Sequence, residues 1–328
     1  MTVEKFTLSR NDSIMEGWPD IIKLASGRLL VSYNECTAHA DRNHSWIAVR
    51  YSDDDGKTWS EGYHVGEETF HGDHWNSIRL SQLANGRVEL VCDRVVKSEL
   101  SDECELYIWE SLDGGESFGK KRRIGIHGFC SDKIRELSDG RLLLCVSRYN
   151  PSIQKNEVAA FKSNDGGASW RETAIVASSE KYNFIEPAAI ELTDGRVAVF
   201  LRENSFSGLG GFVAISSDKG ESFDGFFEID VAGMHRPFLN KLRDGRVILS
   251  YREFLNRESR NLKACIFDES EIKPGGRFEA TLIDSDSAEV ADSGYSAWVE
   301  LDGGEILMVN YIVDDAPRAY ICGYRISL

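Results

Sequence analysis

The chain has 328 residues, of which 41% are hydrophobic and 28% are charged, a composition typical of a globular protein. Its 38 lysines and arginines stand against 54 aspartates and glutamates, and the resulting net charge of −16 argues against binding to nucleic acid or to an anionic membrane surface. No apolar run approaches the ~20 residues that a membrane helix requires.

The N-terminal segment and the cysteines both bear on the compartment. The segment MTVEKFTLSRND has no hydrophobic signal-peptide core. The seven cysteines are scattered, and several lie inside apolar runs such as LLLCVS and LKACIF, which is typical of buried thiols rather than of a disulfide framework. We therefore expect a cytoplasmic protein.

The first predicted element is a strand at residues 3–10, and the chain then repeats one pattern six times. In each repeat a leucine, a short polar turn with glycine and an apolar run follow one another, with 50 to 59 residues between successive turn glycines. Glycine accepts the positive φ that tight hairpin turns demand. The pattern predicts six hairpins, with turn glycines at Gly27, Gly86, Gly140, Gly195, Gly245 and Gly303.

A second turn pattern follows four of these hairpins at a nearly constant distance. It reads S-x-D-x-G-x-[ST]-[WF], and its glycine lies 25 to 29 residues after the preceding hairpin glycine. The serine and aspartate side chains can bond backbone amides of the turn, and the aromatic ring can fill the adjacent core. The four copies begin at Ser52, Ser111, Ser163 and Ser216.

Each repeat therefore predicts four antiparallel strands, and helical periodicity is hardly visible. Six such sheets predict an all-β fold, a six-bladed β-propeller of four-stranded antiparallel blades. The last repeat contains only three strands before the chain ends, so we expect the N-terminal strand to complete it. We predict a single domain over residues 1–328.

The second turn is similar to the Asp-box of BNR repeats, and the whole chain resembles the sialidase (neuraminidase) superfamily of six-bladed propellers. The resemblance implies a retaining glycoside hydrolase that removes a sugar from an oligosaccharide or glycoconjugate, with no cofactor and no metal. Asp-boxes also occur in lyases and in binding proteins, so the function depends on the site.

The resemblance also implies the catalytic residues. Tyr295, in DSGYSAWVEL, matches the family's nucleophile, and Glu186, in NFIEPAAIEL, matches the glutamate that activates it. Asp41, in the loop ECTAHADRNHSW, matches the acid/base. A phenol is a suitable nucleophile because an anionic sugar would repel a carboxylate.

Arginines are expected to hold the carboxylate of the substrate. Arg202 and Arg260 match two members of the family's trio, with Arg252 and Arg257 competing for the place of Arg260. The first blade departs from the family, because its R-I-P pattern is replaced here by Gly17–Pro19. No other side chain reproduces the fork of a guanidinium, so the substrate is expected to differ from sialic acid.

In a propeller, the pocket lies where the innermost strands start and the second strands end. A uronic acid or a neutral sugar whose hydroxyls bind acidic residues there becomes a candidate substrate. The further substrate-binding candidates at these places are Asp20, Glu35, His74, Asn76, Arg148, His235, Arg236 and Arg252.

Two other functions stay open at this stage. A propeller lyase would abstract a proton beside a uronate carboxylate, using Tyr295, His74 or His235 as base and Arg202 to neutralise the carboxylate. A non-catalytic carbohydrate-binding propeller is the second alternative. The cysteine and histidine spacings match no zinc signature, and the sequence leaves the sugar, its linkage and the oligomeric state open.

Overall fold

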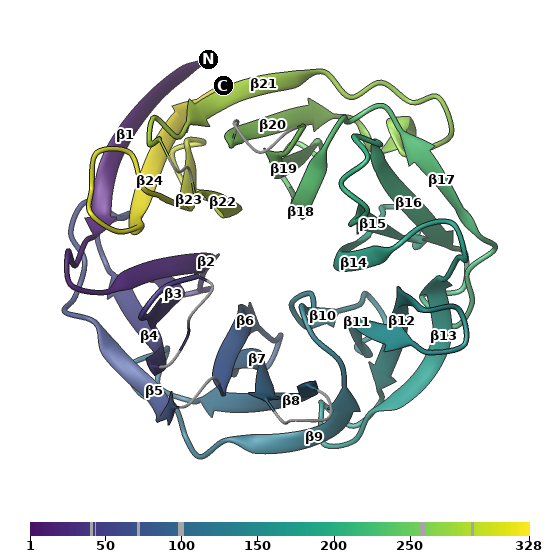
Figure 1. Cartoon of the computed structure of the whole chain (residues 1–328), viewed down its shortest axis with the longest axis horizontal. Coiled ribbons are helices and arrows are strands. Elements are labelled where there is room, and N and C mark those ends of the chain that lie inside the picture. Colours follow the sequence, from purple (N-terminus) through teal and green to yellow (C-terminus); the bar gives the residue numbers. More distant parts are fainter. Residues whose placement is uncertain (40–41, 43, 71–72, 98–101, 256–259, 290–291) are drawn as a thin grey trace. The chain divides into compact units, whose positions relative to one another are not determined.

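The computed structural model describes residues 1–328 except 40, 41, 43, 71, 72, 98–101, 256–259, 290 and 291. In the described residues, the strands assemble into six four-stranded antiparallel sheets (Figure 1). These sheets are the blades of a six-bladed β-propeller, so the predicted fold class is confirmed. No helix within the described ranges is long and apolar enough to cross a membrane, and the only one there is the single turn η1 (Glu269–Glu271).

Each blade is built from consecutive strands, innermost strand first. Blade 1 contains β2 (Met15–Lys23), β3 (Leu29–Cys36), β4 (His44–Ser52) and β5 (Tyr63–Phe70). Blade 2 contains β6 (His74–Gln82), β7 (Val88–Lys97), β8 (Asp102–Ser111) and β9 (Arg122–His127). Blade 3 contains β10 (Arg135–Glu136), β11 (Leu142–Asn150), β12 (Lys155–Ser163) and β13 (Arg171–Ala177).

The second half of the chain follows the same order. Blade 4 contains β14 (Phe184–Glu191), β15 (Val197–Glu203), β16 (Gly211–Ser216) and β17 (Phe226–Ile229). Blade 5 contains β18 (Met234–Lys241), β19 (Val247–Glu253), β20 (Asn261–Phe267) and β21 (Ala280–Ser285). Blade 6 contains β22 (Gly294–Glu300), β23 (Ile306–Ile312), β24 (Tyr320–Ser327) and β1 (Thr2–Ser9).

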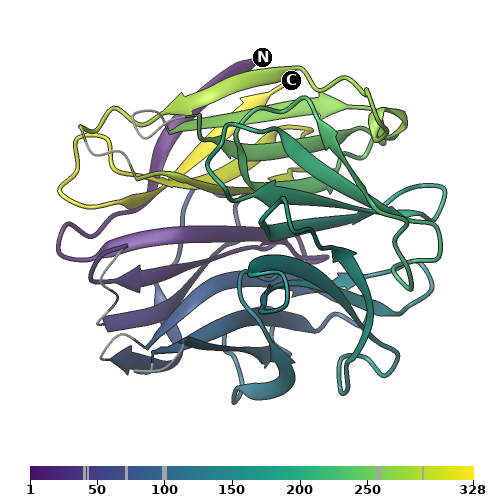
Figure 2. The ribbon, with the colours of Figure 1, turned by 45° about the vertical axis from the view of Figure 1, so that its right-hand side comes forward.

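The N-terminal strand completes the last blade. β1 runs antiparallel to β24, with Thr2 opposite Ser327, and Figures 1 and 2 show the purple strand beside the yellow one. Strands from the two ends of the chain therefore share one sheet, as the sequence led us to expect.

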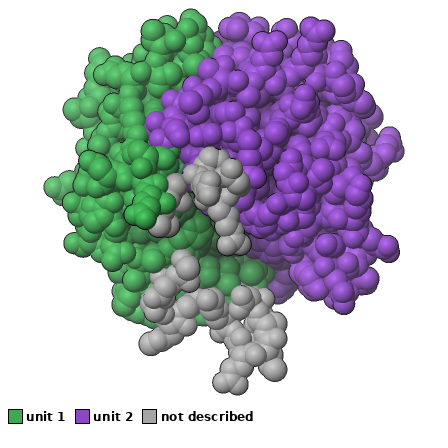
Figure 3. Space-filling model, turned by 45° about the horizontal axis from the view of Figure 1, so that its top comes forward, with its two compact units in different colours: residues 1–123, 286–328 green, residues 124–285 purple. Residues whose placement is uncertain are grey.

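The chain divides into two compact units, which are described separately below (Figure 3). Unit 1 contains residues 1–123 and 286–328, and unit 2 contains residues 124–285. The single domain expected from the sequence stays a prediction.

The six hairpins form at the predicted glycine turns, with one correction. In the first turn Gly27 has a φ of 93° and its amide donates to Leu24 O at 2.8 Å. In the last turn the same hydrogen bond and a φ of 85° belong to Gly304, so the prediction of Gly303 was wrong by one residue. The DGG sequence offers two glycines, and the leucine three residues earlier decides which one takes the positive φ.

The four S-x-D-x-G-x-[ST]-[WF] turns have the side-chain bonding expected of them. In the first, the Gly56 amide donates to Ser52 Oγ at 2.9 Å and the Thr58 amide donates to Asp54 Oδ1 at 2.9 Å. The other three repeat this bonding around Asp113, Asp165 and Asp218. These local bonds account for the constant phase of the motif along the chain.

The inner strands are buried on both faces, which explains their apolar composition. Every residue of β15 and every residue of β14 except the last is buried. In unit 2, Phe200 and Leu249 belong to one continuous core that joins blades 4 and 5. Polar residues within such strands therefore need a specific explanation.

Candidate active site

The innermost strands of five blades carry a β-bulge at the same point of their pairing. In blade 4, for example, Ile185 lies opposite Arg202 and Ala188 opposite Phe200, so two residues, Glu186 and Pro187, face one. The same shift occurs in blades 1, 2, 5 and 6. The first bulge residues of the five blades are Trp18, Asn76, Glu186, Arg236 and Tyr295.

Four of these five bulges hold their first residue in an uncommon backbone conformation. Trp18, Glu186, Arg236 and Tyr295 have φ values of 55°, 52°, 48° and 63°. Non-glycine residues rarely adopt positive φ, and those that do cluster at functional sites, where bulges re-aim side chains. The first bulge position is thus occupied by two residues predicted to be catalytic, Glu186 and Tyr295. It is also occupied by two residues predicted to bind substrate, Asn76 and Arg236.

The second strand of each of these blades also has a residue at a recurring position. It pairs with the innermost-strand residue that comes directly before the bulge. Arg202 on β15 lies opposite Ile185, and Arg252 on β19 lies opposite His235. Tyr311 on β23 takes the same place in blade 6, where it lies opposite Gly294.

In unit 2, these positions build a buried basic cluster around one carboxylate. Arg202 Nη1 lies 2.9 Å from Glu186 Oε2, and the two side chains are only 6% and 2% exposed. The Arg236 backbone amide donates to the same oxygen at 3.1 Å, and the Arg236 guanidinium bonds Ser131 O. Arg252 Nη2 lies 3.5 Å from His235 Nδ1. The Arg202 guanidinium thus pairs with Glu186, whereas the guanidiniums of Arg236 and Arg252 contact Ser131 and His235.

Aromatic rings border this cluster. His235 stacks on Phe254 with ring centroids 4.8 Å apart, and the exposed Phe206 meets the imidazole edge-on at 5.5 Å. The guanidinium of Arg260 lies 4.0 Å from the centre of the Phe254 ring. Arg260 is thus held near the cluster, as the resemblance implied for a binding arginine, and its role stays a prediction.

The electrostatics of the cluster are strongly positive at His235. Burial and the charges of Arg202 and Arg252 lower the pKa of His235 to about 2, although Glu186 opposes this shift. The imidazole is therefore neutral at physiological pH.

In unit 1, the bulge residues lie among aromatic side chains. Tyr295 is half-buried, and its ring meets Tyr311 edge-on at 6.1 Å between centroids. Tyr311 donates from its hydroxyl to Asp292 at 3.0 Å, and Asp292 also bonds His39 Nδ1 at 2.9 Å. The ring of Trp18 lies 5.7 Å from that of Tyr311. Asp292 and His39 therefore connect the blade 1 loop with the strand end of blade 6.

Arg42 supplies a guanidinium beside the bulge of blade 1, where the family's arginine is absent. Its guanidinium carbon lies 3.9 Å from the centre of the Trp18 ring, a cation–π contact. Its Nη1 donates to Asn76 Oδ1 at 2.9 Å, and the Asn76 amide in turn donates to Asp93. Arg42 is thus positioned by the bulge residues of two blades.

Three predicted binding residues are held in other contacts. Asp20 is fully buried, and its Oδ2 accepts the Leu80 amide at 2.7 Å, so it links the inner strands of blades 1 and 2. Arg148 lies one residue beyond the equivalent of Arg202, and it forms ion pairs with Glu157 and Glu172 at 2.9 and 2.7 Å. Side chains alternate between the two faces of a strand, so this one-residue offset turns Arg148 away from the equivalent set.

Glu35 shows the same offset in blade 1. It follows Asn34, the equivalent of Arg202, and its Oε2 bonds His64 Nε2 on the outer strand at 2.7 Å. Arg148 and Glu35 therefore point away from the equivalent set that includes Arg202, because of a register that the turn motifs alone leave uncertain by one residue. The binding roles expected of Asp20, Arg148 and Glu35 stay predictions.

The remaining predicted residues have mixed outcomes. Asp41 and Arg257 lie outside the described residues, so the acid/base assignment stays a prediction. His74 is half-buried at the start of β6. Tyr295 belongs to unit 1 and Glu186 to unit 2, so their pairing also stays a prediction.

Sequence reasoning missed several residues around these clusters, notably Asp292, Phe206 and Phe254. A signal for the bulges themselves was present, because three of the first bulge residues precede proline, at Trp18, Glu186 and Arg236. Proline lacks an N–H, so within a sheet it is confined to places such as bulges. In the described part of the chain, no group of three or more histidine, cysteine or acidic side chains could hold a metal ion.

The chain belongs to the family of BNR repeat-like domains, whose model matches residues 27–308. It is similar in structure to a protein of unknown function from Dyadobacter fermentans DSM 18053, with 22% identity, a TM-score of 0.86 and 98% of both chains covered. No curated protein matches it.

Structures of sialidases are also similar. The intramolecular trans-sialidase from Ruminococcus gnavus has 14% identity and a TM-score of 0.71, with 95% of this chain and 94% of that chain covered. The NanB sialidase from Streptococcus pneumoniae has 15% identity and a TM-score of 0.71, with 96% and 68% covered. At such identities the likeness establishes the fold, and the predicted sialidase-like propeller is confirmed.

Proposed function

We propose that this protein is a retaining glycoside hydrolase that releases an anionic sugar from an oligosaccharide or glycoconjugate, with Tyr295 as the nucleophile. The observation that carries the proposal is the basic cluster of unit 2. Arg202 pairs there with the Glu186 carboxylate, Arg252 lies beside His235, and burial together with the charges of Arg202 and Arg252 keeps His235 neutral. Guanidinium groups bind a carboxylate in a two-point fork, which suits a sugar acid.

The proposed reaction has two steps. Tyr295 Oη attacks the anomeric carbon and transfers its proton to Glu186, while the leaving oxygen takes a proton from Asp41. Water then attacks the glycosyl-tyrosine, gives its proton to Asp41, and the proton on Glu186 returns to the tyrosine. Two inversions retain the anomeric configuration. The ion pair with Arg202 supports this proposal because it fixes the Glu186 carboxylate in one orientation.

Arg42 bears on which sugar acid fits. The family's first arginine is replaced by Gly17, and the guanidinium of Arg42 lies instead over Trp18. A guanidinium that approaches from a loop rather than from a strand changes the geometry of the carboxylate fork. We therefore propose a uronic acid, or another sugar acid distinct from sialic acid, as the substrate, in the cytoplasm.

His235 is a weak candidate for the base of a lyase. A general base works best when its pKa lies near the operating pH, whereas burial and two arginines lower the pKa of His235 to about 2. Elimination would therefore depend on Tyr295 or His74.

A product-resolved screen tests the proposal. The purified chain is incubated with aryl glycosides and oligosaccharides of sialic acid, uronic acids and neutral sugars, and products are read by mass and by the absorbance of unsaturated uronates. We expect a water-added uronic acid product, which the Tyr295→Phe variant fails to form. An unsaturated product would establish a lyase, and binding without any product would establish a carbohydrate-binding protein.

A further inference from the structure

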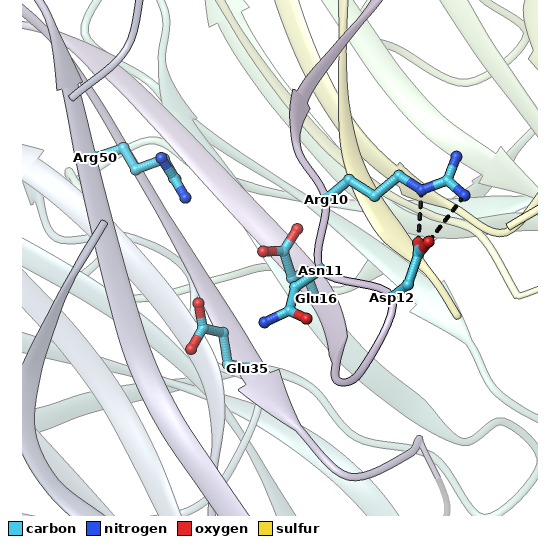
Figure 4. Close-up of a pocket in the computed structure, with 6 residues that line it drawn as sticks. All are labelled: Arg10, Asn11, Asp12, Glu16, Glu35 and Arg50. Atoms are coloured by element: carbon cyan, nitrogen blue, oxygen red, sulfur yellow. Dashed lines mark hydrogen bonds and ion pairs between the residues drawn. The ribbon is translucent and has the colours of Figure 1, made fainter. Parts of the chain in front are cut away.

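A pocket of about 500 Å³ lies in unit 1, and none of its lining residues occupies a bulge position. Its lining side chains come from the segment between β1 and β2 and from β2, β3 and β4 (Figure 4). They are Arg10, Asn11, Asp12, Glu16, Glu35 and Arg50. Small-molecule sites commonly have volumes of roughly 300 to 1,000 Å³, so the pocket has the size of a small ligand.

Glu16 forms the inner wall of the pocket, and one of its oxygens lacks a hydrogen bond of ordinary geometry. The residue is 1% exposed, and Ser9 Oγ donates to its Oε1 at 2.7 Å. Its Oε2 is buried and has no hydrogen bond of ordinary geometry among the described residues, although the Ile321 backbone amide acts on this carboxyl group as a weak donor. The terminal torsion of glutamate is broad, so either oxygen can turn toward the pocket. Because buried polar atoms are almost always bonded, this oxygen points to a missing donor.

Glu35 stands directly opposite Glu16 on the neighbouring strand, and its side chain is held in place by His64. Arg50 lies on the other side, where its Nε donates to Tyr33 Oη at 2.9 Å and its Nη1 donates to Ser60 O at 2.8 Å. These contacts hold the Glu35 carboxylate, a hydrogen-bond acceptor, and the Arg50 guanidinium, a donor, in fixed positions at the wall of the pocket.

The charges in the pocket nearly cancel. Arg10 forms an ion pair with Asp12 at 2.7 Å, and the charge of Arg50 acts on Glu16. Burial, together with the neighbouring Glu35, raises the pKa of Glu16 to about 7, so this carboxyl group is partly neutral at physiological pH. The three carboxyl groups disfavour an anion, and the two guanidiniums disfavour a cation. A neutral donor of hydrogen bonds is the group that fits Glu16 Oε2.

We propose that this pocket binds a neutral, hydroxyl-rich ligand, namely a mono- or disaccharide without a charged group. Sugar hydroxyls both donate and accept, so they match the carboxyl groups of Glu16 and Glu35 and the donors of Arg50 and Asn11 at once. The site goes beyond the proposed hydrolysis, because it uses neither Tyr295 nor the basic cluster and requires no turnover.

The experiment measures binding to the full chain by saturation-transfer NMR and calorimetry. The probes are the methyl glycosides of glucose, galactose and N-acetylglucosamine, with maltose and lactose. Glu35→Gln removes the charged acceptor, and Glu68→Gln is the matched control, since Glu68 bonds His44 on the same blade at 2.6 Å without lining the pocket. We expect the first variant to weaken binding roughly tenfold and the control to leave it unchanged.

A second variant, with its thermal unfolding measured, distinguishes a loss of binding from a loss of folding. Glu16→Gln keeps the size of the side chain and replaces Oε2 or its neighbour by an amide, so it too should weaken binding while thermal unfolding stays cooperative. The proposal is overturned if no probe binds below roughly 10 mM, if both glutamate variants bind as the wild type does, or if acetate or ethylammonium displaces the sugar. Tyr295→Phe should bind the probes as the wild type does. Loss of sugar binding in this pocket and loss of the proposed hydrolysis can therefore be told apart.

Discussion

The buried ion pair between Glu186 and Arg202 yields a quantitative prediction. The change Glu186→Gln keeps the shape and one acceptor but removes the charge that faces Arg202 at 2.9 Å, in a place where the two side chains are 6% and 2% exposed. Removing one partner from a buried pair leaves the other charge without compensation, a loss of about 3 to 5 kcal/mol. Since glutamine still accepts a hydrogen bond, we expect about 3 kcal/mol.

The matched control is Glu172→Gln. Glu172 pairs with Arg148 at a similar distance, 2.7 Å, but the two side chains are 41% and 30% exposed. Exposed pairs contribute about 1 kcal/mol or less. The assay is urea unfolding followed by tryptophan fluorescence and circular dichroism. Equal stability losses for the two variants would refute the conclusion that burial makes the Glu186 pair different.

Three further predictions concern the same clusters and the turns. Arg42→Met should lower kcat/KM on a sugar acid glycoside by roughly tenfold or more and Arg42→Lys by less, and unchanged values for both would show that Arg42 does not hold the carboxylate. Because burial and neighbouring arginines keep the pKa of His235 at about 2, against about 6.5 unfolded, His235 costs stability as pH falls below that unfolded value. From pH 8 to pH 5 the wild type should lose about 2 kcal/mol more than His235→Gln, as measured by urea titrations at each pH. Asp218, whose pKa the hydrogen bond from Ser222 lowers to about 2, stabilises its turn above pH 4 and loses this effect as pH falls toward 2. Asp218→Asn should thus destabilise by about 1 kcal/mol at pH 7 and by little at pH 2, and a loss that persists at pH 2 would contradict the charge argument.

The blades could be predicted because their turns are local. A glycine with positive φ and a serine–aspartate pair that bonds backbone amides need no distant contact, so six hairpins and four further turns were visible in the sequence. The error at Gly303 shows the limit of this signal, since two adjacent glycines left the turn uncertain by one residue.

The site residues depended on register, which local patterns do not determine. Arg148 and Glu35 follow the equivalent strand positions by one residue, and the alternation of side chains turned both away from the set that includes Arg202. Arg42 could not be placed from sequence either, because a loop has no period. Its position follows from contacts with Trp18 and Asn76, which are far apart in the chain.

The central claim is that Tyr295 forms a covalent bond with the sugar, and trapping tests it most directly. A fluorinated glycosyl fluoride of the best substrate is incubated with the protein, since fluorine beside the anomeric carbon slows hydrolysis of the intermediate more than its formation. Intact-mass spectrometry should show one added glycosyl group, with peptide mapping placing it on Tyr295 and no addition on Tyr295→Phe. Turnover of the substrate without a trapped adduct, or an adduct on another residue, would contradict the account.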